Sequence, residues 1–344
     1  MPPSDRARPR RATRPPRRSL FDLSFDEIAD LEDPETAGDV YRSLYRHRRT
    51  TATVRRVART HDLTTSALPL QAVERGSMTT KHLFGLPDGS SVETVAITRR
   101  TGTTACVSSQ VGCAFRCAFC ASGQDGLTRH LSPGEIVQQV LQLGTRINRV
   151  VFMGIGEPLH NYDNVLAAIR ILRDRRGRGL STRGITISTI GPPAALRRLR
   201  EEHLGINLTI SLHATDDAVR RELIPGARAH RIEEVIDGSQ SWAERHGRPV
   251  TYVYLLLPGH NDTDEDLDRL IGWFADRPAR VNLMRWNPVD GEQRFLRADD
   301  RLLARFRRAL VDARVDTAVR DTQGLDVDAA CGQLRARRMR SVPR

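Results

Sequence analysis

The sequence predicts an α/β protein whose parallel strands form a partial (β/α)6, TIM-like barrel with a small N-terminal helical accessory domain. Strand-like and helix-like segments alternate about six times after residue 104, and such a repeat implies a parallel sheet with helices outside it. The run Val150–Met153 is continuously apolar, which is typical of a strand buried on both faces. A flat, doubly wound sheet is the structural alternative.

The predicted elements follow one another along residues 79–332. The first two strands flank Pro87-Asp88-Gly89, which predicts a hairpin, and Ser132-Pro133-Gly134-Glu135 is a capping box that opens a helix. The predicted strands are 81–86, 91–97, 104–108, 150–153, 185–190, 206–212, 250–257, 281–286 and 317–319. The predicted helices are 136–147, 164–173, 194–202, 232–245, 264–274 and 301–313.

Four regions are predicted along the 344 residues: a disordered basic tail (1–18), a helical accessory region (19–78), the barrel core (79–332) and a basic C-terminal tail (333–344). Most of the net charge of +12 falls in the two tails, which favours contact with phosphate backbones, although a general bias toward Arg explains the same composition. Residues 40–49 predict a basic amphipathic helix whose two tyrosines could touch RNA; a solvated helix face is the alternative.

The composition also bears on the compartment. No run of about eighteen apolar residues is present, so no membrane span is predicted. The Arg- and Pro-rich N-terminus lacks the apolar region of a secretory signal, so the clustered thiols are expected to act as ligands in the reducing cytoplasm.

Three of the five cysteines, Cys113, Cys117 and Cys120, fall within eight residues at C-x3-C-x2-C spacing. A structural zinc site needs four protein ligands, and this motif supplies three. A cubane iron–sulfur cluster held by three thiolates leaves one iron open to a small molecule that carries an amine and a carboxylate. The spacing therefore favours an iron–sulfur cluster.

Polar or small residues follow several predicted strands. In a parallel barrel the carboxyl ends of the strands meet at one face, where the chemistry takes place. Two glycines in the loop after residue 153 let backbone approach a ligand, and Glu157 is placed to accept hydrogen bonds from an ammonium group. The strand-end residues are Gly156, Glu157, Ser188, Ser211, Leu212, His213 and Asn287.

Together these motifs resemble those of the radical S-adenosylmethionine enzymes, and more closely those of the RlmN/Cfr adenine methyltransferases. The resemblance covers roughly residues 80–334. It is carried by Cys106–Cys113, Gly154–Leu159, Ile187–Gly191, Ser211–His213, Val281–Leu283, Asn287-Pro288 and Asp328–Leu334.

The resemblance implies a set of cofactors and their ligands. Cys113, Cys117 and Cys120 would hold one 4Fe-4S cluster whose open iron binds S-adenosyl-L-methionine. The cofactor-contacting positions of the family correspond to Gly156, Glu157, Ser188, Ser211, Leu212, His213 and Asn287. One-electron reduction would then yield a 5′-deoxyadenosyl radical.

The resemblance also implies a route for the methyl group. One S-adenosylmethionine methylates Cys331, and the radical from a second removes a hydrogen from that S-methyl group. The carbon radical adds to adenine, and Cys106 resolves the adduct, which leaves a Cys106–Cys331 disulfide bond. Glu93 corresponds to the proton acceptor. The substrate implied is ribosomal RNA, with transfer RNA as a second option.

Two departures from the family pattern bear on specificity. Ile155 replaces the usual Met of the Gly-Glu-Pro loop. Residues 320–328 lack the Arg-Gly pair common in the RlmN group, and together with Leu257-Pro258-Gly259 and Arg285-Trp286-Asn287 they resemble the Cfr side more closely. Methylation at C2 and at C8 are both open. We also expect an electron donor such as flavodoxin or ferredoxin, and a monomer. The alternatives are a radical enzyme with another substrate and a non-catalytic, metal-stabilised RNA-binding protein.

Overall fold

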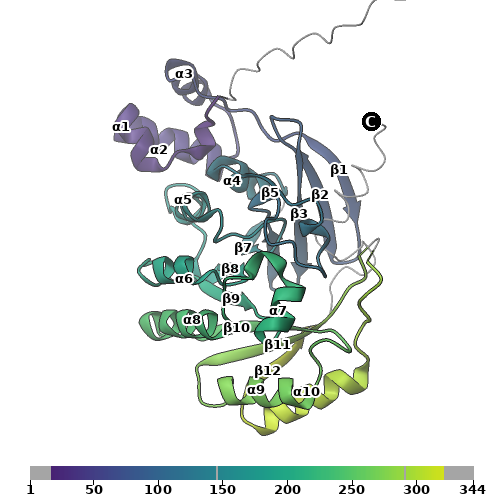
Figure 1. Cartoon of the computed structure of the whole chain (residues 1–344). Coiled ribbons are helices and arrows are strands. Elements are labelled where there is room, and N and C mark those ends of the chain that lie inside the picture. The colour runs from purple at the N-terminus through teal and green to yellow at the C-terminus, as the bar shows by residue number, and fades with distance from the viewer. Residues whose placement is uncertain (1–16, 145, 290–291, 321–344) are drawn as a thin grey trace, which may run out of the picture.

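A single sheet of ten strands runs through the computed structural model, which describes residues 17–144, 146–289 and 292–320. The strand order is β1-β2-β3-β4-β7-β8-β9-β10-β11-β12 (Figure 1). All neighbours from β4 to β12 are parallel. These strands are β4 (Gly102–Cys106), β7 (Ile147–Phe152), β8 (Ile185–Thr189), β9 (Asn207–Ser211), β10 (Val250–Leu256), β11 (Ala279–Arg285) and β12 (Asp316–Arg320).

Helices connect the parallel strands, and the sheet curves with α4, α5, α6 and α8 in a row along one side (Figure 1). This arrangement confirms the predicted partial barrel, because each strand is followed by a helix that returns the chain to the start of the next strand. The connecting helices are α4 (Pro133–Leu141), α5 (Tyr162–Arg173), α6 (Pro193–Arg200), α8 (Ile232–His246), α9 (Asp264–Phe274) and α10 (Asp300–Asp312).

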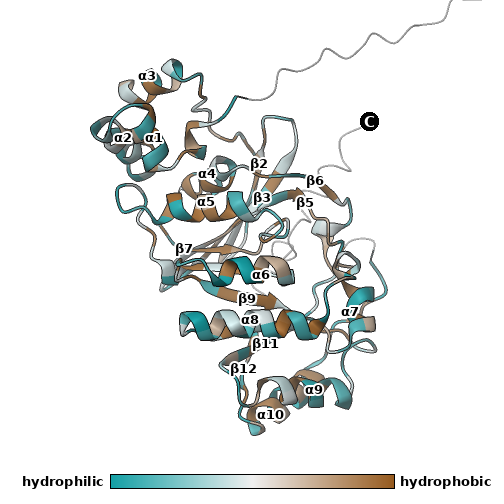
Figure 2. Ribbon diagram, turned by 60° about the vertical axis from the view of Figure 1, so that its left-hand side comes forward, coloured by the Kyte–Doolittle hydropathy of each residue, from teal (hydrophilic) through white to brown (hydrophobic). Residues whose placement is uncertain are grey.

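Apolar side chains of the strands and of the inward helix faces form the core (Figure 2). Val150 and Phe152, on one face of β7, are at most 1% exposed, but Val151 is only partly buried and Met153 is 39% exposed, so the predicted burial on both faces holds for one face only. Tyr252 and Tyr254 of β10 are also fully buried, and each hydroxyl has a hydrogen-bond partner. Buried tyrosines need such partners, because an unpaired hydroxyl in an apolar core is costly.

An antiparallel extension precedes the barrel: β1 (Leu70–Arg75), β2 (Thr79–Gly85) and β3 (Ser91–Arg99). The predicted hairpin corresponds to β2 and β3, and Gly89 adopts φ +83° in its turn. The sequence did not predict β1, whose exposed and charged residues lack a clear alternation.

Three further differences from the sequence-based elements concern short or capped segments. The helix predicted over 136–147 ends at Leu141, since Gly144 turns the chain at φ +73° and Ile147 already opens β7. The helix α7 (Asp217–Leu223) and the 3-10 turn η5 (Pro225–Ala227) were not predicted. Neither was the two-stranded sheet of β5 (Gln110–Gly112) and β6 (Leu127–His130).

The N-terminal helices α1 (Phe25–Leu31), α2 (Pro34–Tyr41) and α3 (Ala52–Thr60) lie beside α4 (Figure 1). Instead of one helix over 40–49, α2 ends at Tyr41 and a π-helical turn follows over Arg42–Arg46. Tyr41 and Tyr45 are at most 1% exposed, and their ring centroids lie 4.6 Å apart. The expectation that these tyrosines touch RNA is therefore wrong, because they pack inside this helical segment.

None of the helices in the described ranges has the length and apolar character needed to cross a membrane.

Candidate functional site

The cysteine loop, residues 113–126, is closed at its base by the β5–β6 sheet. The backbone N–H of Cys113 donates to the Gly126 carbonyl at 2.9 Å. Gly112 has φ +76°, and a Cβ there would lie 1.9 Å from that same carbonyl oxygen. Only glycine fits this approach, so Gly112 lets both ends of the loop meet.

All three predicted cluster ligands lie in this loop. Each is partly buried, and the Cys120 N–H donates to the Cys117 carbonyl at 3.1 Å. Burial raises the pKa of Cys113 to about 12 and that of Cys117 well above its ordinary value, and the neighbouring Cys120 and Glu157 add to both shifts. Thiolates here therefore need a strongly cationic partner.

The donor set fits an iron–sulfur cluster. In the described ranges, no three His, Cys, Asp or Glu side chains converge on one point as ligands of a single ion. In a cubane each thiolate binds a different iron, and three thiols in one loop are a donor set that such a cluster takes. Cys113, Cys117 and Cys120 would hold such a cluster.

Helix α7 and the turn η5 contact the cysteine loop and hold it through two backbone hydrogen bonds. The Ala118 N–H donates to the Leu223 carbonyl, and the Gly226 N–H to the Phe115 carbonyl, both at 2.9 Å. A Cβ on Gly226 would lie 2.4 Å from the Phe115 Cα. The cysteine loop is thus fixed by backbone contacts to a segment about 100 residues later in the chain.

The loop after β7 lies directly against the segment that leads into the cysteines. Gly156 has φ +104°, and a Cβ there would lie 2.5 Å from the Gln110 Cβ. The Glu157 N–H donates to Gln110 Oε1 at 2.8 Å, and the Ser109 N–H donates to the Ile155 carbonyl at 2.9 Å. The two-glycine loop and the cysteine motif therefore form one unit.

Glu157 joins the ends of β7 and β8. Its Oε1 accepts hydrogen bonds from the Thr189 hydroxyl at 2.6 Å and the Leu159 N–H at 2.9 Å, and its Oε2 accepts one from the Ile190 N–H at 2.9 Å. Burial raises the pKa of this carboxyl to about 7, although those hydrogen bonds act in the opposite direction. Both oxygens are thus engaged by the protein.

His213 follows β9 with φ 57° and is 7% exposed. Its Nδ1 accepts a hydrogen bond from the Leu255 N–H at 3.1 Å, so in the neutral ring Nε2 carries the proton. Burial, together with the charge of Arg220, lowers its pKa to about 3. The ring packs edge-to-face against Phe119 of the cysteine loop, with centroids 4.9 Å apart.

The other predicted strand-end residues lie along the same edge. Ser188 pairs with Thr209, and Ser211 with Val253, in the parallel ladder. After β11, Asn287 Oδ1 accepts a hydrogen bond from Arg297 at 3.0 Å. Trp286 donates from Nε1 to the Phe119 carbonyl at 3.1 Å, which brings the end of β11 to the cysteine loop.

Cys106 and Glu93 are buried on neighbouring strands, at 6% and 2% exposure. Cys106 pairs with Val95, and Glu93 lies two residues from Val95, so the three side chains share one face of the sheet. The Ser108 hydroxyl donates to the Glu93 carbonyl at 2.6 Å. Cys331, its pairing with Cys106, and residues 321–328 lie outside the described residues.

Arg220 of α7 is a site residue that sequence reasoning missed. It is 1% exposed, and its guanidinium donates to the carbonyls of Ile190 at 2.7 Å and Leu212 at 3.4 Å. Those residues follow Thr189 and Ser211 at the ends of β8 and β9. In the sequence, the only local indication of the helix that carries Arg220 is Asp216, whose side chain caps the N-terminus of α7.

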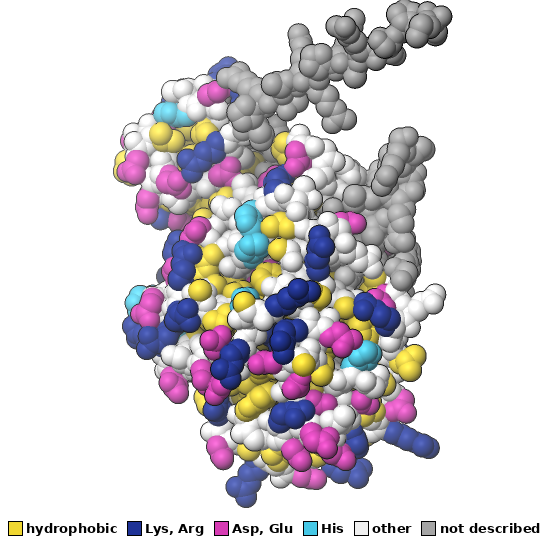
Figure 3. Space-filling model, in the orientation of Figure 1, with side chains coloured by type: hydrophobic (Ala, Val, Ile, Leu, Met, Phe, Trp, Pro, Cys, Tyr) yellow, Lys and Arg dark blue, Asp and Glu magenta, His cyan; other side chains and the backbone are white. Residues whose placement is uncertain are grey.

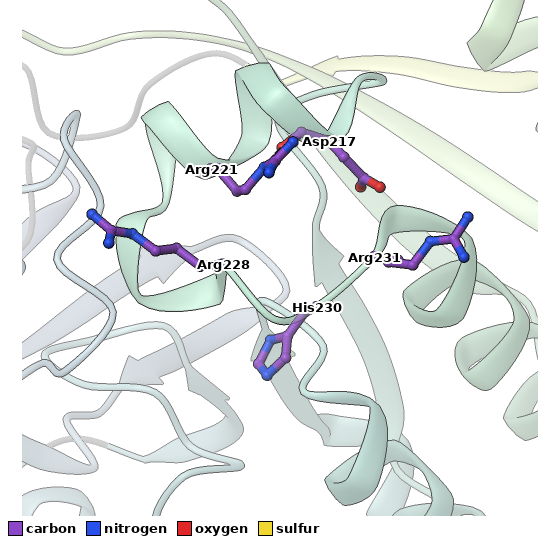
Figure 4. Close-up of a pocket in the computed structure, with 5 residues that line it drawn as sticks. All are labelled: Asp217, Arg221, Arg228, His230 and Arg231. Atoms are coloured by element: carbon purple, nitrogen blue, oxygen red, sulfur yellow. Dashed lines mark hydrogen bonds between the residues drawn. The ribbon is translucent and has the colours of Figure 1, made fainter.

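A basic pocket of about 150 Å³ opens beside α7. Figure 4 shows its lining side chains, with His230 below α7 and Arg228 and Arg231 to either side. The His230 ring lies 6.1 Å from that of Phe115, which connects the pocket to the cysteine loop. Arg side chains also lie over α7 in the middle of the face shown in Figure 3. The pocket is lined by Asp217, Arg221, Arg228, His230 and Arg231.

Comparisons with known proteins agree with this geometry. Residues 107–271 match the model of the radical SAM superfamily. A probable RNA methyltransferase of Rhodopseudomonas palustris is 54% identical over 322 residues, covering 93% of this chain and 89% of that protein. A probable dual-specificity RNA methyltransferase RlmN of Symbiobacterium thermophilum is 44% identical over 273 residues, covering 78% and 74%.

A solved structure extends this likeness to the fold. The crystal structure of a radical SAM methyltransferase from Sphaerobacter thermophilus superposes with a TM-score of 0.85 at 33% identity, covering 92% of this chain and 98% of that one. The chain therefore belongs to the radical SAM superfamily and, within it, to the RlmN/Cfr-type RNA methyltransferases.

Proposed function

We propose that this RNA methyltransferase methylates a ring carbon of adenine, C2 or C8, in ribosomal or transfer RNA. The observation that carries the proposal is the meeting of the cysteine loop with the ends of the parallel strands. Phe119 of the loop contacts both His213, after β9, and Trp286, after β11. A cluster held in the loop would therefore face the residues expected to bind S-adenosylmethionine.

The cysteine loop and the strand ends have separate tasks in this proposal. Cys113, Cys117 and Cys120 would hold a 4Fe-4S cluster, and S-adenosylmethionine bound to it supplies a 5′-deoxyadenosyl radical on reduction. The fixed backbone at Gly156 and the neutral His213 would orient S-adenosylmethionine without adding positive charge to its binding site. The strand-end residues in contact would be Gly156, Glu157, Ser188, Ser211, Leu212, His213 and Asn287.

The two remaining cysteines would carry the methyl group to RNA. Ring carbons of adenine that lie between two nitrogens are electron-poor and do not attack a sulfonium methyl as an amine would. Cys331 would therefore present the methyl group as an S-methyl that a radical can activate. Glu93 would accept the proton from the adenine ring, and Cys106 would attack the Cys331 sulfur, so that a Cys106–Cys331 disulfide forms as the bond between that sulfur and the methylene carbon breaks. The released carbon would take up a proton to become the methyl group, and the unpaired electron left by the radical addition would return to the cluster. The burial of Cys106 and Glu93 on one sheet face supports these roles.

RNA would approach past α7. The pocket of Arg221, Arg228 and Arg231 offers several cations within one side-chain contact of the cysteine loop. We further propose an electron donor such as flavodoxin or ferredoxin, a monomeric enzyme and a cytoplasmic location. The electron donor follows from the one-electron reduction that cleaves S-adenosylmethionine, and the location from cysteines that act as ligands in a reducing compartment.

Metal content and product analysis test the proposal. Anaerobically purified protein should be brown and contain about four irons and four sulfides per chain, and it should methylate adenosine in RNA. Activity on a protein, with Cys106 and Cys331 dispensable, would favour the radical enzyme with another substrate. Zinc in place of iron and sulfide would favour the non-catalytic RNA-binding protein.

A further inference from the structure

Arg220 is a buried cation whose acceptors are neutral. Within the described residues, its three hydrogen bonds all reach backbone carbonyls: Ile190 at 2.7 Å, Leu212 at 3.4 Å and His230 at 3.5 Å. In the part of the chain that the structure describes, no carboxylate forms an ion pair with it. The next residue, Arg221, is exposed on the same helix.

Burying such a charge is unfavourable unless an opposite charge lies nearby. Carbonyls satisfy the N–H groups of the guanidinium but do not neutralise it. Burial lowers the pKa of Arg220 to about 10, and the neighbouring Cys117, Asp217 and Glu157, where they are ionised, oppose that shift. Arg220 therefore keeps its charge at neutral pH. The unfavourable free energy of burying that charge must be offset by another interaction.

The surroundings of Arg220 point to the cysteine loop. Leu223, three residues later on α7, accepts the hydrogen bond from the Ala118 N–H, one residue after Cys117. Ile190 accepts from Arg220 at its carbonyl and donates from its N–H to Glu157. Arg220 thus lies between the carboxylate at the strand ends and the loop that carries the three thiols.

We propose that Arg220 is the buried counter-cation of the iron–sulfur cluster and raises its reduction potential. This inference rests on the proposed function, because it requires a cluster in the cysteine loop. Three thiolates outweigh the positive charge of an oxidised cubane core, and reduction by one electron adds a further negative charge. A fixed cation nearby stabilises the reduced form more than the oxidised form, and local charge is one of the terms that set such potentials.

Three variants distinguish the effect of the Arg220 charge from the effect of its side-chain shape. Arg220→Met removes the charge and keeps an unbranched side chain, Arg220→Lys keeps the charge, and Arg221→Met makes the same chemical change at the exposed neighbour. Each is purified anaerobically without RNA. Iron and sulfide are assayed, and the midpoint potential of the cluster is measured by redox titration monitored by electron paramagnetic resonance.

We expect a more negative midpoint potential in Arg220→Met, and potentials close to that of the parent in Arg220→Lys and Arg221→Met. Arg220→Met with a full cluster and an unchanged potential would overturn the inference. If Arg220→Met holds no iron, Arg220→Lys decides: a cluster retained by lysine supports the role of the charge. Loss of iron from both Arg220→Met and Arg220→Lys would overturn the inference. The hydrogen bonds from the guanidinium to the backbone carbonyls would then be enough to explain why an arginine is buried at this position.

The same experiment keeps this inference apart from the proposed function. A parent protein without iron and sulfide would overturn both. A parent that holds the cluster but methylates no RNA would remove the proposed substrate only, because the potentials are measured without RNA.

Discussion

Phe119 and His213 join the cysteine loop to the end of β9: their ring centroids lie 4.9 Å apart at an interplanar angle of 78°. The sequence separates them by more than ninety residues, and this contact, together with the Trp286 hydrogen bond to the Phe119 carbonyl, brings the loop against the strand ends. Edge-to-face pairs of this kind add about 0.5–1.5 kcal/mol beyond the area they bury. The hydrogen bond from the Leu255 N–H to Nδ1 requires that nitrogen of His213 to be unprotonated.

His213→Asn should make the stability of the protein less dependent on pH between about 6.5 and 3. The folded-state pKa of His213 is lowered to about 3, so the unfolded chain binds its proton first. The stability that depends on the neutral ring is present above about pH 6.5 and is lost as pH falls toward 3, by up to about 1.4 kcal/mol per pH unit.

Asparagine is the suitable replacement because it tolerates the positive φ of this position and its Oδ1 can accept the Leu255 N–H in place of Nδ1. Urea unfolding of the metal-free protein at several pH values measures the effect. His47→Asn, at an exposed position, is the control. Parallel stability profiles for the parent and His213→Asn would contradict the burial argument.

Cys113→Ser should lose most of its iron, whereas Cys106→Ser should keep it. Cys113 is one of three proposed ligands, and Cys106 lies on β4 outside the cysteine loop. Iron and sulfide assays on anaerobically purified protein compare the two. Equal iron content in both variants would show that the loop does not hold the cluster.

Gly156→Ala should destabilise the fold more than Gly259→Ala. Both glycines have positive φ, but a Cβ at Gly156 meets Gln110 at 2.5 Å, whereas a Cβ at Gly259 meets nothing within 4 Å. We expect a loss of roughly 2–5 kcal/mol at Gly156 from strain plus overpacking, against about 1–2 kcal/mol at Gly259 from backbone strain alone. Denaturant unfolding measures both, and equal losses would argue against the close contact of the two loops.

Replacing Arg221, Arg228 and Arg231 by glutamine should weaken RNA binding and make it less sensitive to salt. Each phosphate contact contributes about 0.7 to the slope of log affinity against log salt for single strands. A triple variant of Arg301, Arg307 and Arg308, which are exposed on α10, removes the same charge elsewhere. Fluorescence anisotropy at several salt concentrations compares them. Equal effects of the two triples would show that net charge, and not the pocket, binds RNA.

Elements with strong local signals could be predicted from the sequence. The helix 264–274 was predicted with its observed bounds, since Thr263 and Asp266 form a capping box. The helix α7 was missed because it has seven residues, of which several are charged, and its stability comes from the buried Arg220 and Leu223. Such tertiary support leaves little trace in local periodicity.

The candidate site likewise contains residues that could be predicted from the sequence and one that could not. The cysteine spacing and the polar strand ends are short motifs, so the sequence identified them. Arg220 could not be found, because nothing local distinguishes a buried arginine from the many exposed ones. Its acceptors, Ile190 and Leu212, lie just after β8 and β9 and meet it only in the folded barrel.

The most direct test of the account follows the methyl group itself. RNA from a strain that lacks this protein is incubated with the reduced, cluster-loaded enzyme and S-adenosylmethionine bearing a trideuterated methyl group, and adenosine is then analysed by mass spectrometry. The account predicts a ring-carbon methyl that has lost one deuterium to the radical, and no methylation by Cys331→Ala. A fully deuterated methyl group on adenosine, or methylation that survives Cys331→Ala, would contradict it.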